Sequence, residues 1–267
     1  VNAHAGQPVR VSPLFWEVLV EALTAAEMSE GLYDPTLLDA LEMAGYTVSF
    51  EHLSVGTRSG RNPMVRPLWP RRSRQPWRQI ELNPIARTVT LPPHTRLDLG
   101  GIAKGWAAER AAQHLAALGP CLVDAGGDLA ARGTPPPAVA APGQPGWPIG
   151  IADPFHPDRD RALLLLHRGG VATSGVDHRH WYHRGIRQHH LIDPRTGRPA
   201  VTDVLTATVI APTATQADVL ASIVVILGAR AGLRRLLATS KVEGLLIRKD
   251  GRIETTPGLM AYGFRWL

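Results

Sequence analysis

Apolar residues recur every three to four positions after residue 13, the spacing of one face of an α-helix. In Leu14–Ser29 that face consists of Phe15, Val18, Leu19, Ala22, Leu23 and Ala26. Ser12 and Pro13 are a typical N-cap and first-turn pair, and Gly31 is a typical residue just beyond a helix end. We predict further helices over Thr36–Met43, Lys104–Leu118, Ala214–Leu227 and Ala229–Leu237.

Short apolar and β-branched runs bounded by turn residues predict strands. Two predicted hairpins pair Gln79–Leu82 with Thr88–Leu91, and Gly244–Ile247 with Arg252–Thr255. The other predicted strands are Cys121–Asp124, Leu129–Arg132, Trp147–Asp153, Ala162–Leu166, Val171–Gly175 and Thr206–Ala211. Because hairpins dominate and helices lie between them, the predicted class is α+β with antiparallel sheets rather than a doubly wound parallel sheet.

Size and composition are those of a globular chain. It has 267 residues, of which 44% are hydrophobic, and we expect one domain over residues 1–267. No window of about 18 apolar residues predicts a transmembrane helix. The single cysteine, Cys121, excludes a disulfide framework and a cysteine-based zinc site.

The formal net charge is +6, and the densest basic run is Arg66–Arg78. Such a run can contact nucleic acid, but it lacks a nucleic-acid-binding motif, and a solvated loop is the commoner meaning. We therefore predict an irregular connection over residues 48–79 and no nucleic-acid partner.

The turn Leu97–Gly105, with the sequence LDLGGIAKG, joins a predicted strand to a predicted helix. Asp98 supplies a carboxylate, Gly101 lets the backbone approach a ligand closely, and Lys104 stands at the helix start. Unpaired N–H groups make helix N-termini suitable for phosphate. A plain strand-to-helix turn with a solvated lysine explains the same residues, so both interpretations stay open here.

Three other stretches carry candidate chemistry. The five histidines between residues 178 and 190 fit no standard zinc spacing, which favours exposed strand residues with one possible general base. Asp218 and Ser222 are four residues apart on a predicted helix and offer hard oxygen ligands suited to Mg²⁺. A surface-paired aspartate is the alternative. Leu32, Tyr33 and Asp34 lie in a loop that either lines a pocket or forms a simple turn.

Five motifs occur in one order: LDLGGIAKG, VDAGGD, VATSG, HLIDPRTGRP and APTATQADVLAS. In this order and spacing they resemble the ApbE family of Mg²⁺-dependent FAD:protein FMN transferases, over about residues 11–258. The resemblance implies an α+β, T-fold-like arrangement of antiparallel sheets and packed helices. It also implies transfer of FMN from FAD to a Thr or Ser hydroxyl in the flavinylation motif of an acceptor protein, with release of AMP.

The resemblance assigns roles to individual residues. The implied Mg²⁺ ligands are Asp218, Ser222 and the backbone carbonyl of Gly101. The residues implied to contact FAD are Leu32, Tyr33, Asp34, Asp98, Lys104 and Leu191. His190 matches the proposed catalytic base, which would take the proton of the acceptor hydroxyl.

The sequence departs from the family pattern in four places, one of which is that residues 52–77 do not match it. About 60 to 80 N-terminal residues of the family, including a flavin-contacting segment, have no counterpart here, by our alignment of the first helix. Ser222 replaces the usual Thr and lacks the methyl group that restricts its rotamer. Asp124 stands where Asn is common and adds a negative charge near the expected pyrophosphate site.

Two alternatives to the transferase are an FAD pyrophosphatase, in which water replaces the acceptor hydroxyl, and a non-catalytic flavin-binding protein. Asp98, His190, Asp218 and the hydroxyl at residue 222 argue against the second of these. The first residues have no signal-peptide layout, whereas family members are often exported and lipid-anchored, so localisation is left open.

Overall fold

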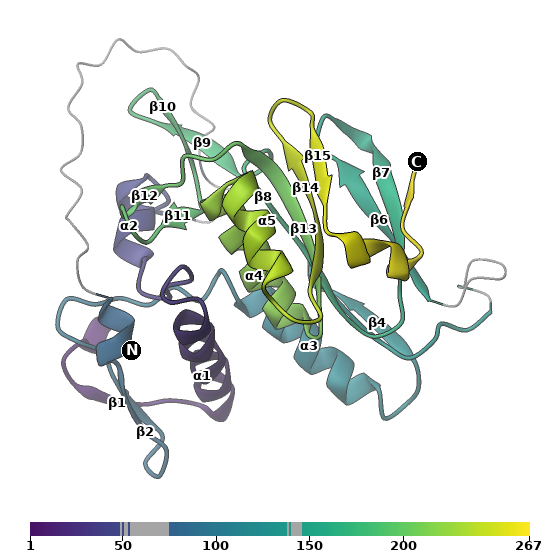
Figure 1. Cartoon of the computed structure of the whole chain (residues 1–267). Coiled ribbons are helices and arrows are strands. Elements are labelled where there is room, and N and C mark those ends of the chain that lie inside the picture. The colour runs from purple at the N-terminus through teal and green to yellow at the C-terminus, as the bar shows by residue number, and fades with distance from the viewer. Residues whose placement is uncertain (49, 51–52, 54–74, 138, 140–145) are drawn as a thin grey trace. The chain divides into compact units, whose positions relative to one another are not determined.

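Figure 1 shows a computed structural model of the chain, which describes residues 1–48, 50, 53, 75–137, 139 and 146–267. The chain divides into two compact units: residues 1–101 with 178–201, and residues 102–177 with 202–267. The expectation of one domain over residues 1–267 stays a prediction. Among the described residues, no helix has the length and apolar character needed to cross a membrane.

The first unit is built from short elements. Its helices are η1 (Asn2–His4), α1 (Pro13–Met28), α2 (Leu38–Met43) and η3 (Pro76–Gln79). Its strands are β1 (Pro8–Arg10), β2 (Glu81–Asn83), β3 (Thr88–Thr90), β9 (His180–His183), β10 (Ile186–His189), β11 (Ile192–Asp193) and β12 (Arg198–Pro199). They form an antiparallel sheet in the order β1–β3–β2 and the two antiparallel pairs β9–β10 and β11–β12.

Helix α1 begins and ends as its sequence predicts. The Ser12 hydroxyl accepts a hydrogen bond from the Phe15 N–H at 3.2 Å, and Pro13 opens the first turn. Gly31 follows the helix with φ +81°, and its N–H donates to the Ala26 carbonyl at 2.7 Å. The loop that follows, which includes the candidate residues Leu32 to Asp34, is therefore fixed to the end of α1.

The second unit contains a six-stranded antiparallel sheet in the order β15–β14–β13–β8–β5–β4. These strands are β4 (Cys121–Asp124), β5 (Leu129–Arg132), β8 (Gly169–Gly175), β13 (Val204–Ala211), β14 (Glu243–Arg248) and β15 (Ile253–Thr255). A three-stranded sheet contains β6 (Trp147–Asp153), β7 (His156–Leu166) and β16 (Arg265–Trp266). The helices are α3 (Ala103–Leu115), α4 (Ala214–Leu227), α5 (Ala229–Leu237) and η4 (Pro257–Tyr262).

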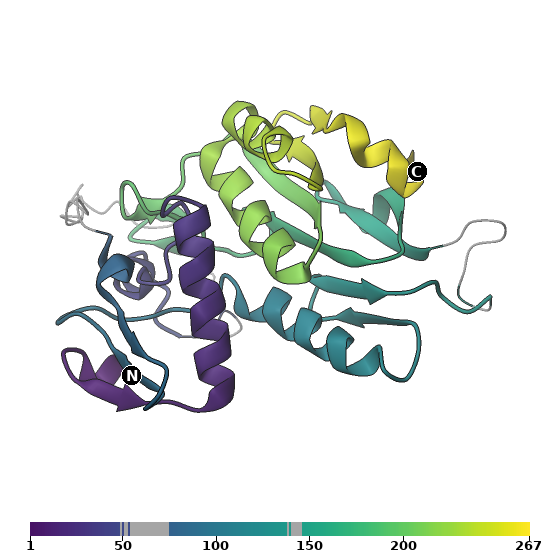
Figure 2. The same cartoon turned by 60° about the horizontal axis from the view of Figure 1, so that its bottom comes forward.

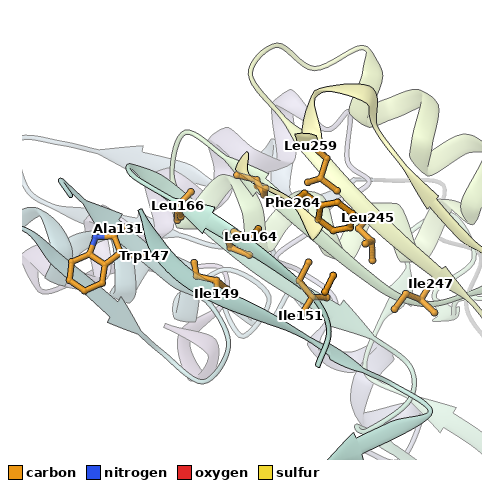
Figure 3. Close-up of a cluster of buried hydrophobic side chains, with 13 residues drawn as sticks. Ala131, Trp147, Ile149, Ile151, Leu164, Leu166, Leu245, Ile247, Leu259 and Phe264 are labelled. Carbon is orange, nitrogen blue, oxygen red and sulfur yellow. The ribbon is translucent and has the colours of Figure 1, made fainter. Parts of the chain in front are cut away.

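The six-stranded sheet is covered on both faces. On one face, Val171 and Ile210 join an apolar core with the inward side chains of β6 and β7. Figure 3 shows Ile149 and Leu164 among the side chains of this core. On the other face, α4 packs against β8 and β13, and α3 packs beside α4 and against β5 (Figure 1 and Figure 2). Gly170 permits this packing, because a Cβ there would lie 2.2 Å from the Cα of Ala214.

Most predicted elements are present, with shifted ends. The bounds of α4 and α5 are those predicted, whereas α3 ends at Leu115, three residues early. Strand β7 begins at His156, whereas the sequence predicted Ala162. The prediction missed the first half of the strand because that half is polar and exposed and has no alternating apolar residues. The sequence did not predict β1, β16 or the short helices η1, η3 and η4. Most of the irregular connection predicted over residues 48–79 lies outside the described residues.

Candidate functional site

In the first unit, two loops that the sequence singled out are joined directly. The N–H of Asp98 donates to the Pro35 carbonyl at 2.8 Å, and the Asp98 carboxylate accepts from the Gly100 N–H at 3.0 Å. A Cβ on Gly101 would lie 3.4 Å from the Tyr33 ring, so the turn runs against that ring. Neither Gly100 nor Gly101 has a positive φ, so the backbone conformation does not require glycine at either position. What the two glycines provide is the small space that they occupy.

The Tyr33–Asp34 loop is buried and ordered by local hydrogen bonds. The Tyr33 N–H donates to the Ser29 hydroxyl at 3.0 Å. The Asp34 carboxylate accepts from both the N–H and the hydroxyl of Thr36, at 2.8 and 2.5 Å. One oxygen of the Asp34 carboxylate is therefore engaged in forming the turn. Leu32, which precedes Tyr33, is half-buried. The role of these residues toward FAD stays a prediction.

His190 and Leu191 connect β10 to β11. Leu191 is buried and its carbonyl accepts from the Ala200 N–H at 2.9 Å, while His190 is half-buried. In the neighbouring hairpin, His180 lies directly across from His189. Within the described part of the chain, no three histidine, cysteine, aspartate or glutamate side chains gather into a group that could hold a metal ion. His190 is thus held at the end of an ordered hairpin.

In the second unit, α3 and α4 are bound to each other at two levels. The Gly105 N–H donates to the Asp218 carboxylate at 3.2 Å. One turn further along α3, the buried Glu109 accepts from the N–H of Ala214, the first residue of α4, at 3.0 Å, and pairs with Arg132. A Cβ on Gly105 would lie 2.6 Å from the Ala214 carbonyl oxygen. This close contact fixes Asp218 against the first turn of α3.

Asp218 is 5% exposed, and its surroundings disfavour its charge. Burial, followed by the negative charge of Asp128, raises the pKa of Asp218 to about 7, despite opposing contributions from Lys104 and the Gly105 N–H. Lys104 forms its ion pair with Asp128, at 2.5 Å. Lys104 therefore lies near two buried carboxylates, and a further positive charge beside Asp218 would favour its ionised form.

Ser222 lies one helical turn after Asp218 on α4. Its hydroxyl is 2.9 Å from the hydroxyl of Ser174 on β8. Both residues are half-buried. The sequence placed Asp218 and Ser222 on one helix, and the structure confirms that placement and adds Ser174 as the partner of Ser222.

The residues present fit a magnesium ion. An Asp carboxylate, a Ser hydroxyl and a backbone carbonyl are hard oxygen donors, and Mg²⁺ commonly uses few protein ligands. A cation beside Asp218 would also relieve its repulsion with Asp128. Gly101 belongs to the first unit and Asp218 to the second, so their convergence stays a prediction.

Sequence reasoning missed several residues that shape this region. Asp128 and Ser174 lie inside the motifs VDAGGD and VATSG, so the motifs could have drawn attention to them. Gly105 ends the motif LDLGGIAKG, whereas Glu109 lies in no motif. The importance of both comes from helix α4, more than 100 residues away in sequence. Gly126 and Gly127, between β4 and β5, both have positive φ, which accounts for the glycine pair in VDAGGD.

Comparison with known proteins gives a consistent result. Residues 1–246 match the ApbE family. The FAD:protein FMN transferase of Treponema pallidum is 34% identical over 97% of this chain and 73% of its own length, and that of Haemophilus influenzae is 28% identical over 95% and 72%. The crystal structure of the ApbE protein of Thermotoga maritima has a TM-score of 0.77 at 28% identity, covering 98% of this chain and 82% of its own.

A second solved structure, the apo form of a flavinyl transferase ApbE from Pseudomonas stutzeri, has a TM-score of 0.74 at 24% identity and covers 98% of this chain and 78% of that one. The predicted fold class, an α+β arrangement of antiparallel sheets and packed helices, is confirmed. The predicted relation to a family of flavin-transferring enzymes is confirmed as well. The chain belongs to the ApbE family.

Proposed function

We propose that this protein transfers FMN from FAD to a Thr or Ser hydroxyl of an acceptor protein, with Mg²⁺ as its metal. The family relation supports the reaction class. The observation that carries the proposal is Asp218, a buried carboxylate whose charge is opposed by Asp128 and which lies against the first turn of α3. A diphosphate with its cation supplies both a positive charge beside Asp218 and the anion that a helix N-terminus attracts.

In the proposed reaction, the acceptor hydroxyl oxygen forms a bond to the phosphorus of the FMN half of FAD. The bond from that phosphorus to the bridging oxygen breaks, and AMP leaves with the bridging oxygen. His190 takes the hydroxyl proton, because an unassisted hydroxyl is a poor nucleophile. FMN thereby becomes attached to the acceptor through a phosphoester.

Asp218, Ser222 and the carbonyl of Gly101 would hold the Mg²⁺. When bound, the metal neutralises charge on the phosphate oxygens as the bridging bond breaks. The carboxylate of Asp218 is already anchored by the Gly105 N–H, so one of its oxygens has a fixed direction. A fixed ligand lowers the cost of ordering the site on binding.

The remaining candidate residues are assigned to FAD. Tyr33 lies beside the Asp98–Gly101 turn, and Asp98 is fixed to Pro35 in the same loop pair. We assign this surface, with Leu32, Asp34 and Leu191, to the flavin. Lys104, paired with Asp128 at the start of α3, is assigned to FAD as a point charge near its phosphates.

The test is incubation of the protein with FAD, Mg²⁺ and an acceptor protein that carries a family-type flavinylation motif, beside the same acceptor with its motif Thr replaced by Ala. We expect covalent FMN on the intact acceptor only, equimolar AMP, and loss of both products in EDTA. FMN and AMP without an adduct would instead identify a pyrophosphatase. Absence of turnover with FAD bound would identify a flavin-binding protein.

A further inference from the structure

The Ser222 hydroxyl has a hydroxyl partner that no part of the proposed reaction uses. Ser174 of β8 places its Oγ 2.9 Å from the Ser222 Oγ of α4. We propose that Ser174 is a positioning residue for the metal site: it accepts the proton of the Ser222 hydroxyl and thereby directs the oxygen lone pairs of Ser222 to the cation. This inference rests on the proposed function, because it requires Ser222 to be a metal ligand.

The fold sets Ser174 in this position by strand alternation. Alternate residues of β8 point to opposite faces of the sheet. Val171 belongs to the apolar core shared with β6 and β7, whereas Gly170 abuts Ala214 of α4. Ser174 has the parity of Gly170 and therefore faces α4, as its contact with Ser222 shows.

The chemistry of a hydroxyl ligand explains how the contact between Ser174 and Ser222 would assist metal binding. A neutral hydroxyl that binds a cation through its oxygen must direct its proton elsewhere, and it donates best to a nearby acceptor. A serine also lacks the second substituent on Cβ that restricts the χ1 rotamer of threonine. A fixed partner at 2.9 Å supplies the restriction that the Ser222 side chain lacks.

The same strand offers a matched control. Thr173 is adjacent to Ser174 but points to the opposite face of the sheet, where its hydroxyl lies 2.8 Å from the hydroxyl of Thr208. The two are direct partners in the register of β8 and β13. Thr173→Val therefore removes a hydroxyl–hydroxyl hydrogen bond of the same kind without touching α4.

The experiment measures binding of Mn²⁺, an EPR-visible substitute for Mg²⁺, to the full chain without FAD, from the loss of the free-ion signal. We compare the wild type with Ser174→Ala, Ser222→Ala, the double variant and Thr173→Val. We expect Ser174→Ala to weaken binding about 3- to 10-fold, the range for one hydrogen bond of ordinary net strength. The double variant should bind no more weakly than Ser222→Ala alone, and Thr173→Val should bind as the wild type does.

Each other pattern overturns a specific claim. If Ser222→Ala weakens binding and Ser174→Ala does not, the positioning role of Ser174 is wrong and the metal assignment stands. If the two losses add in the double variant, Ser174 acts independently of Ser222 and the inference fails. If Ser222→Ala binds Mn²⁺ like the wild type, the ligand assignment in the proposed function fails, and the inference fails with it.

Discussion

Replacing Asp218 by Asn should stabilise the metal-free protein at neutral and alkaline pH. Asn has nearly the same shape, and its carbonyl oxygen can still accept from the Gly105 N–H. It cannot ionise, so it removes the cost of holding a charged carboxylate at a site that is 5% exposed and close to Asp128. The substitution thus separates the electrostatic cost of the carboxylate from its packing.

The magnitude follows from the pKa. The Asp218 pKa is raised from 3.8 to about 7 in the folded protein, so the folded state binds the proton more tightly than the unfolded state does. The contribution of Asp218 to the free energy of unfolding is therefore fully present below about pH 4 and is lost as the pH rises through about 7. A difference of about three pH units corresponds to about 4 kcal/mol, an upper bound for the gain in the variant at pH 8.

The assay is urea unfolding of the metal-free protein from pH 5 to pH 8.5, with hydrogen exchange of the α4 amides as a local measure. The advantage of Asp218→Asn should grow with pH and level off above pH 7. Asp158→Asn, which changes an exposed carboxylate on β7, controls for net charge. An advantage of Asp218→Asn that is absent, or that does not change with pH, would refute the electrostatic account of this site.

Three further substitutions test other parts of the account. His190→Ala should leave FAD binding nearly intact and slow FMN transfer roughly 10²- to 10⁴-fold, and unchanged transfer would remove His190 from the mechanism. Gly105→Ala places a methyl group against the Ala214 carbonyl and should lower the free energy of unfolding by about 1–3 kcal/mol, measured in urea; no loss would mean that the helices separate freely. Glu109→Ala leaves the Arg132 guanidinium without its buried partner and should lower the free energy of unfolding by about 3–5 kcal/mol, measured in urea. A loss below about 1 kcal/mol, which is typical of a surface ion pair, would contradict the role of Glu109 at the start of α4.

Elements with strong local signals were predictable from the sequence. Helix α4 was predicted to the residue, because its start and end are marked locally. The Thr213 hydroxyl accepts from the Gln216 N–H at 3.1 Å, and Gly228 follows the helix with φ +79°. Strands β1 and β16 had no such marks. They are two or three residues long and exist through pairing with β3 and β7, which are distant in sequence.

The candidate site likewise has features that follow from local sequence and features that depend on long-range packing. Asp218 and Ser222 could be singled out because their spacing on one helix is a local property. The sequence also singled out Lys104 as a candidate site residue. It did not predict the ion pair of Lys104 with Asp128, because that pair depends on how α3 packs beside β5. The importance of Gly105 likewise appears only when the facing helix is known. The sequence thus singles out candidate side chains of this site, whereas long-range packing determines its charge balance.

The contacts between α3 and α4 hold Asp218 in surroundings that disfavour its charge. The repulsion between Asp218 and Asp128 favours any movement that separates the carboxylates or admits water between them. Gly105 and Glu109 limit movement of Asp218, because they hold α4 against α3 at two successive turns through Asp218 and Ala214. These contacts keep Asp218 buried, and burial is the first cause of its raised pKa. It follows that a cation should stabilise the wild type more than Asp218→Asn, since only the wild type has a carboxylate whose repulsion the cation relieves.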